Sequence, residues 1–342
     1  MLKNAFFRPN DLKYNLYFHI GSHRTATSAL QDYLFRNRDA LKAQGYLYPF
    51  DCKRHLEVVN AVFARKIRPA QVSQQILEQM EAEATPLHSV VISDEDICMR
   101  KNLTMLGKFR KFFNVKVIYT LRRQDLWLES WHLQNIKWQW DPKYSHCTFE
   151  EFLGKRKKFH WIQYDSYVSH LEKIFGTENV LLNIYEKHPD VPDPIEAFCH
   201  SIGLEPSEDM VKPARVNESF APVVSEFMRC LPLDEAPETY RGVLTTACAK
   251  LSKGYEVNNR LLSYDRRVEL LDTYAAGNRA LAQRYFGRDE LFREPLPDRS
   301  APVADMALPE DSYELMQKFV TPLLKSVIHH QVHHQNKQPP KP

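Results

Sequence analysis

Glycine is scarce in this chain. Only 10 of the 342 residues are glycine, about 3% against a typical usage near 7%. This excludes collagen-like and glycine-rich repeats. A phosphate-binding loop in this chain must therefore be built with few glycines, so a glycine at the junction of a strand and a helix is informative.

Paired cysteines, long apolar runs and a charge excess are also missing. The six cysteines are dispersed without a C-x-x-C pair, so we expect no disulfide framework and no metal site. No run approaches the roughly 18 apolar residues of a membrane span, and we expect a cytoplasmic protein, with peripheral association at the inner membrane face as the alternative. The net charge of +3 makes a nucleic-acid partner unexpected.

Four apolar segments predict strands, at residues 14–19, 89–93, 115–121 and 180–185. Helical spacing separates them, and near-continuous apolar strands alternating with helices predict an α/β fold with a parallel sheet flanked by helices. From about residue 194 the chain is mainly helical. We expect one α/β domain over residues 1–292, a proline-rich connector and C-terminal helix over 293–335, and a disordered tail over 336–342.

A hydroxyl-rich loop follows the first strand. It reads Gly21-Ser-His-Arg-Thr-Ala-Thr-Ser28 and leads into a helix predicted from Thr25. The amides of a helix N-terminus, hydroxyl groups and Arg24 together can hold an oxyanion. The loop is P-loop-like but lacks the second glycine and the Lys–Ser/Thr pair of a kinase loop. The alternative is that Thr25, Thr27 and Ser28 only cap the helix.

A second group of polar residues follows the third strand, in the run Leu121-Arg-Arg-Gln-Asp-Leu-Trp-Leu-Glu-Ser130. Arg122 lies at the carboxyl edge of the strand, and Ser130 follows about two helical turns into the next helix. Both can reach a phosphate. The alternative is a surface arginine pair that caps this helix.

The two segments together resemble the sulfotransferases that use 3′-phosphoadenosine 5′-phosphosulfate (PAPS). In that family the first loop, usually K-T-G-T-T or R-S-G-T-T, binds the 5′-phosphosulfate, and an R-x7-S element binds the 3′-phosphate. Further segments resemble its bacterial carbohydrate-type branch, and the resemblance covers most of residues 14–292; these segments are Trp161–Glu186, Arg215–Ser219 and Tyr274–Phe292.

The resemblance implies a set of site residues. Binding of PAPS, and of its product adenosine 3′,5′-bisphosphate, is carried over to Arg24, Thr25, Ala26, Thr27, Ser28, Arg122 and Ser130. Arg24 replaces the commoner lysine and remains a cation that can bridge two oxygens. Ala26 stands where the family usually has glycine. Alanine suits a helical first-turn backbone, so we expect the loop to enter the helix early.

Two residues are candidates for the general base that an acceptor hydroxyl needs. Glu95 follows the second strand, comparably to the catalytic histidine of cytosolic family members. His55 lies 31 residues after Arg24, comparably to the base carboxylate of several Golgi-type members. We favour Glu95 slightly. The alternatives are that Glu95 belongs to an acidic helix cap and that His55 is a surface histidine.

The resemblance implies an enzyme that moves a sulfuryl group from PAPS to a hydroxyl. We expect the acceptor to be a carbohydrate, whether an oligosaccharide, a polysaccharide or a glycolipid, and we expect catalysis by Arg24 with Glu95 or His55 and without a metal. One alternative is a P-loop phosphotransferase or ATPase. The other is a catalytically inactive, sulfotransferase-like binding protein, which the presence of Arg24 and Ala26 leaves open.

Overall fold

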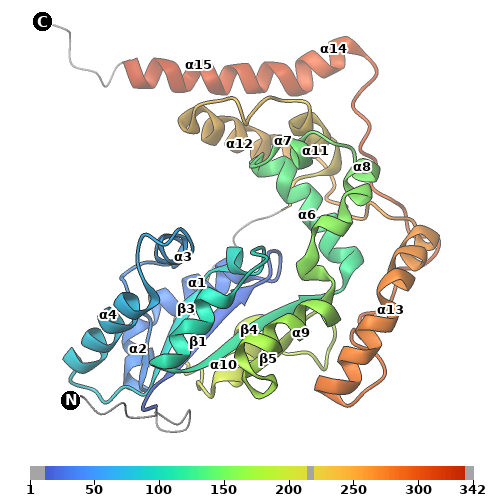
Figure 1. Cartoon of the computed structure of the whole chain (residues 1–342). Helices are drawn as coiled ribbons and strands as arrows, with labels where there is room; N and C mark the ends of the chain where they lie inside the picture. The colour runs from blue at the N-terminus through green and yellow to red at the C-terminus, as the bar shows by residue number, and fades with distance from the viewer. Residues whose placement is uncertain (1–11, 214–218, 336–342) are drawn as a thin grey trace, which may run out of the picture. The chain divides into compact units, whose positions relative to one another are not determined.

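The computed structural model describes residues 12–213 and 219–335 (Figure 1). They form two compact units, each discontinuous along the chain. The first contains residues up to 124, 159–216 and 272–295, and the second contains 125–158, 217–271 and those from 296 onward. The consecutive domain ranges expected from the sequence stay a prediction. The expected tail at 336–342 and most of the segment Arg215–Ser219 lie outside the described residues.

A five-stranded parallel sheet forms the middle of the first unit, in the order β2-β3-β1-β4-β5 (Figure 1). The predicted α/β class and its four strands are confirmed, and β2 is an addition that at two residues is too short to show a period. The strands are β1 (Asn15–Gly21), β2 (Tyr46–Leu47), β3 (Ser89–Ser93), β4 (Asn114–Arg122) and β5 (Val180–Tyr185).

Helices cover both faces of this sheet, because β1, β3 and β4 carry apolar side chains on both faces. On one face Tyr17, Val91 and Ile118 pack with three helices, α1 (Thr27–Arg36), α2 (Arg38–Ala43) and α10 (Pro194–Ile202). On the other face Phe18 contacts Phe109 edge to face at 5.3 Å between ring centroids. There Tyr119 also packs against the aromatic rings of α9 (Tyr164–Phe175).

The segment 103–113, between β3 and β4, contains no continuous helix in the structure. It contains a short helix, α5 (Thr104–Gly107), and a 3-10 turn at Lys108–Lys111. Two more helices lie between β2 and β3, namely α3 (Leu56–Phe63) and α4 (Pro69–Ala82). Pro69 begins α4, where its missing N–H group costs no intrahelical hydrogen bond.

The second unit is helical, which confirms the predicted helical C-terminal region. Its core contains Phe220, Phe227, Met228, Cys248 and Phe319. The helices are α6 (Gln124–Trp138), α7 (Pro142–Ser145), α8 (Phe149–Gly154), α11 (Pro222–Arg229), α12 (Glu238–Ser252), α14 (Ser312–Leu315) and α15 (Thr321–Gln335), with a π-helical turn at Met316–Val320. Helix α6 begins in the first unit, and α13 (Tyr264–Phe286) contributes residues to both.

The strand order determines where the first unit can bind a ligand. Along the chain, β1 is followed by β2 and β3 on one side and then by β4 and β5 on the other. In parallel sheets, ligands bind at the carboxyl ends of the strands where the order changes direction. That point lies at the end of β1, where the hydroxyl-rich loop begins. None of the described helices is both long and apolar enough to cross a bilayer.

Candidate functional site

The loop after β1 starts at a glycine that the geometry requires. Gly21 has a φ of +76°, and a Cβ atom placed on it would lie 2.6 Å from the Cβ atom of Glu95. An L-residue would be strained there and would collide with the residue that follows β3. Gly21 therefore lets the backbone of the loop after β1 and Glu95 lie next to each other.

The backbone at Ala26 differs from the sequence prediction. Ala26 has φ 62° and ψ 21°, which is left-handed, and helix α1 begins only at Thr27. The expectation of an early helical entry was wrong, because the chain takes this tight turn before the helix despite the strain on an L-residue. Arg24 also has a positive φ of 68°, whereas Thr25 between them does not. Alternation of this kind turns successive N–H groups to one side and makes a concave anion-binding backbone.

The hydroxyl groups of this loop do not cap α1. The N-cap residue is Ala26, and no side chain accepts a hydrogen bond there. Thr25 Oγ1 donates to the Ser22 carbonyl oxygen at 2.6 Å, which closes the turn. Thr27 is buried and Ser28 is exposed. The helix-capping alternative is therefore wrong, and the first turn of α1 has no capping side chain.

Arg24 and Arg122 come together at the ends of β1 and β4. Arg122 Nη1 donates to the Arg24 carbonyl oxygen at 2.7 Å, and the Arg122 guanidinium lies over the Tyr185 ring at 5.3 Å from its centroid. Burial lowers the pKa of Arg24 to about 10, with a further contribution from the positive charge of Arg122. Two cations that oppose each other's charge form a place where an anion stabilises both.

The other two residues of the predicted second group lie elsewhere. Arg123 is buried and donates to the carbonyl oxygens of Glu294 and Pro295. The two arginines are therefore not a surface pair that caps α6. Ser130 lies on α6 within the second unit. Arg24 and Arg122 therefore belong to the first unit together, and Ser130 belongs to the second unit.

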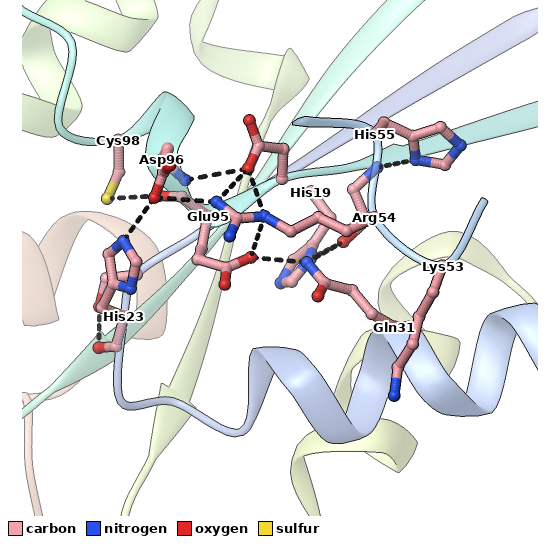
Figure 2. Close-up of polar contacts among 12 residues, drawn as sticks. His19, His23, Gln31, Lys53, Arg54, His55, Glu95, Asp96 and Cys98 are labelled. Atoms are coloured by element: carbon pink, nitrogen blue, oxygen red, sulfur yellow. Dashed lines mark hydrogen bonds and ion pairs between the residues drawn. The ribbon is translucent and has the colours of Figure 1, made fainter. Parts of the chain in front are cut away.

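Glu95 lies at the carboxyl end of β3 in a polar network (Figure 2). Its side chain is 8% exposed. Gln31 Nε2 donates to Glu95 Oε2 at 2.6 Å, and Arg54 Nε lies 3.4 Å from the same oxygen. The acidic cap is also present, since Asp94 accepts a hydrogen bond from the Asp96 N–H group. Glu95 itself points into the network with Arg54 and Gln31.

His55 is fully buried, so the alternative of a surface histidine is wrong. Its Nδ1 accepts from the Ser93 N–H group at 3.0 Å, and its Nε2 donates to the Pro49 carbonyl oxygen at 2.9 Å. Burial lowers its pKa to about 4. Both nitrogens of this ring are used within the protein, so its geometry serves to join the start of α3 to the end of β3.

Three contacting residues were not identified from the sequence. Gln31 lies one helical turn after Thr27, and Arg54 directly precedes His55. His23, inside the loop, lies 2.8 Å from Asp96 through its Nε2 atom. In the sequence, each of these three residues stands beside a residue already selected as a candidate or one helical turn from it, and this position could have identified them. Within residues 12–213 and 219–335, no group of three or more histidine, cysteine or acidic side chains is arranged to hold a metal ion.

Comparisons with known proteins give limited similarity. No family model matches this chain. A curated relative from Archaeoglobus fulgidus, an uncharacterised protein, is 25% identical over 210 residues, which are 59% of this chain and 55% of the relative. The chain thus spans about half the length of that relative. Among solved structures, a sulfotransferase from Alicyclobacillus acidocaldarius is similar with a TM-score of 0.38 and 15% identity, over 59% of this chain and 85% of that one.

Proposed function

We propose that this protein is a sulfotransferase that moves a sulfuryl group from PAPS to an acceptor hydroxyl. The observation that carries the proposal is the approach of Arg24 and Arg122 at the ends of β1 and β4. These are the two segments whose sequences resemble the PAPS-dependent family. The residues present fit an anionic donor, because each guanidinium opposes the charge of the other and a bound phosphate relieves that repulsion.

The donor supplies the sulfuryl group and two phosphates that can be bound. The backbone of residues 24–28, with its alternating φ signs and the open first turn of α1, would hold the 5′-phosphosulfate. Thr25, Thr27 and Ser28 add hydroxyl groups there. Arg122 would bind the 3′-phosphate, and the sequence resemblance makes Ser130 a further candidate for the same phosphate.

Catalysis would rest on charge stabilisation and positioning, as in phosphoryl transfer. Arg24 would stabilise the negative charge that develops on the leaving oxygen. Glu95 would accept the proton of the acceptor hydroxyl. We prefer Glu95 to His55 because both ring nitrogens of His55 already have hydrogen-bond partners, at Ser93 and Pro49.

The sequence resemblance supports a carbohydrate acceptor, and the first unit also has a polar groove, whose lining includes none of the proposed catalytic residues. The groove holds about 440 Å³ and lies beside the segment that leads into Arg54. Its lining combines aromatic rings with cations and anions in equal number, which suits a neutral ligand rich in hydroxyl groups. The lining includes Phe35, Arg36, Arg38, Asp39, Lys42, Tyr48, Phe50, Asp51 and Glu83.

The test compares three ligands by thermal shift and calorimetry. Adenosine 3′,5′-bisphosphate should stabilise the protein more than AMP or ATP, because it alone has the 3′-phosphate. Equal shifts for all three would refute the 3′-phosphate assignment. Magnesium-dependent ATP turnover would instead support a phosphotransferase or ATPase.

Transfer itself is measured with 35S-labelled PAPS and a mixture of maltotetraose, cellotetraose and chitotetraose. Glu95→Gln should bind the bisphosphate with unchanged affinity and lose transfer at least a hundredfold, within the range typical of a general base. Full transfer in this variant would exclude Glu95 as the base. A wild-type protein that binds the bisphosphate but transfers to no carbohydrate would support a binding protein without this activity.

A further inference from the structure

Arg54 lies at the centre of the three acidic residues that follow β3 (Figure 2). Its Nη2 is 2.6 Å from Asp94 Oδ1 and 2.8 Å from Asp96 Oδ1, and its Nε is 3.4 Å from Glu95 Oε2. Arg54 Nε also donates a hydrogen bond to Asp94 Oδ1 at 2.8 Å, and Glu95 lies beside the same N–H group as an ion pair. One planar cation thus contacts three consecutive carboxyl groups.

The backbone that carries Arg54 is fixed by the next residue. The His55 N–H group donates to the Ser93 carbonyl oxygen at 3.1 Å, and the His55 ring accepts from the Ser93 N–H group at 3.0 Å. These two bonds attach the segment before α3 to the last residue of β3. Arg54 is therefore directed toward the residues that come directly after Ser93.

Charge in this network depends on Arg54. Burial opposes a charge on the guanidinium, yet the carboxylates, Glu95 foremost, outweigh burial and raise the pKa of Arg54. Burial also raises the pKa of Asp94 even though Arg54 contacts it. The pKa of Asp96 is lowered: burial opposes this, and the hydrogen bond from His23 and the charge of Arg54 prevail. Without the guanidinium, three neighbouring carboxyl groups would repel one another.

Both contacts of Glu95 fall on one oxygen. Gln31 donates to Oε2 at 2.6 Å, and Arg54 approaches the same atom. Within the described part of the chain, the contacts of this side chain leave Oε1 as the oxygen that can accept a proton. The plane of the carboxylate is held by two side chains from different elements, α1 and the segment before α3.

We propose that Arg54 is a positioning residue that pairs with the Glu95 carboxylate and orients it toward the acceptor hydroxyl. The inference rests on the proposed function. In the reaction, the acceptor proton passes to Glu95 and the acceptor oxygen forms a bond to sulfur. The bond between sulfur and the donor's phosphate oxygen breaks, and its electron pair leaves with the bisphosphate.

The pH dependence of this step involves few groups. Around Glu95, burial raises the pKa of Tyr48 and of Cys98, so both stay neutral in acid. The charged side chains that face Glu95 are Arg54 and the two other carboxylates in contact with it, Asp94 and Asp96, with His23 on Asp96. Removing the guanidinium should make these carboxyl groups take up protons at higher pH.

The experiment measures the rate of sulfuryl transfer against pH in Arg54→Gln, with the oligosaccharide mixture as acceptor. The acid limb should move up by at least one pH unit, equivalent to a tenfold change in proton affinity. The KM for PAPS and the affinity for the bisphosphate should stay within twofold of the wild type. The matched control is Arg299→Gln, because Arg299 forms an ion pair with Asp265 at 3.0 Å outside the proposed site and its side chain is 73% exposed.

An acid limb that stays at the wild-type pH, or moves as far in Arg299→Gln, would overturn the inference. If Arg54→Gln does not fold, Arg54→Lys decides the question, because lysine keeps the charge without the fork. The acid limb of the pH–rate profile of Arg54→Lys should lie at a measurably higher pH than that of the wild type. An acid limb at the wild-type pH again overturns the inference. A wild-type protein that neither binds the bisphosphate nor transfers overturns the proposed function first, which distinguishes the two failures.

Discussion

Replacing Arg122 by alanine should weaken the binding of adenosine 3′,5′-bisphosphate far more than that of AMP. A charge-assisted contact between a guanidinium and a phosphate contributes about 1.5–3 kcal/mol, which is about 10- to 150-fold in Kd. The variant also loses the 2.7 Å bond from Arg122 to the Arg24 carbonyl oxygen. That loss of about 1 kcal/mol makes the loop less well ordered and weakens the binding of both ligands about fivefold.

The ratio of the two dissociation constants therefore isolates the 3′-phosphate, and isothermal titration calorimetry at fixed ionic strength measures it. The matched control is Arg123→Ala, since this neighbour carries the same charge but donates to the carbonyl oxygens of Glu294 and Pro295. The control should lower the stability of the protein and leave the ratio unchanged. An equal loss of affinity for both ligands in Arg122→Ala, or the same change of ratio in the control, would refute the reasoning.

Three further predictions concern stability, measured by urea unfolding. Ala26→Gly should raise the free energy of unfolding by up to about 1 kcal/mol, because glycine adopts the φ of 62° without strain. The control, Ala29→Gly inside α1, should lower the free energy of unfolding by about 1 kcal/mol. A lower free energy of unfolding in both variants would contradict the left-handed turn. Gly21→Ala should cost about 2 kcal/mol or more, since its Cβ would lie 2.6 Å from that of Glu95. A loss below 1 kcal/mol would argue against that close approach. The folded-state pKa of His55 is about 4, below its ordinary value of 6.5, so its contribution to stability is complete above pH 6.5 and is lost as the pH falls toward 4. Between pH 7 and 4.5, His55→Gln should lose about 2–3 kcal/mol less stability than the wild type, and equal losses would contradict the assignment.

Much of the fold could be predicted from local patterns. The segment 89–93 is apolar at every position but its ends, and such a run is typical of a strand covered on both faces. The strands and the helices between them then imply a parallel sheet, whose carboxyl ends meet at one edge. The resemblance assigned Arg24 and Arg122 to one donor site, and the structure brings these two residues, 98 positions apart, together at that edge.

Other features depend on contacts that no local pattern reports. The strand β2 contains two residues and pairs with β3, so its pairing partner, not its own composition, makes it a strand. The left-handed backbone at Ala26 was missed because a short polar loop fits either a helical or a turning entry. Only the backbone angles of Ala26 in the folded chain, φ 62° and ψ 21°, show which turn the chain takes.

The sequence by itself determined the α/β class, the position of the phosphate loop and the residue types available at the site. Only the tertiary structure decided the environment of each titratable side chain. From their positions in the sequence alone, after a predicted strand or before a predicted helix, His55 and Glu95 were comparable candidates for the base. Burial and hydrogen-bond partners separate them, and these come from residues about 40 to 60 positions away that a one-dimensional pattern cannot place.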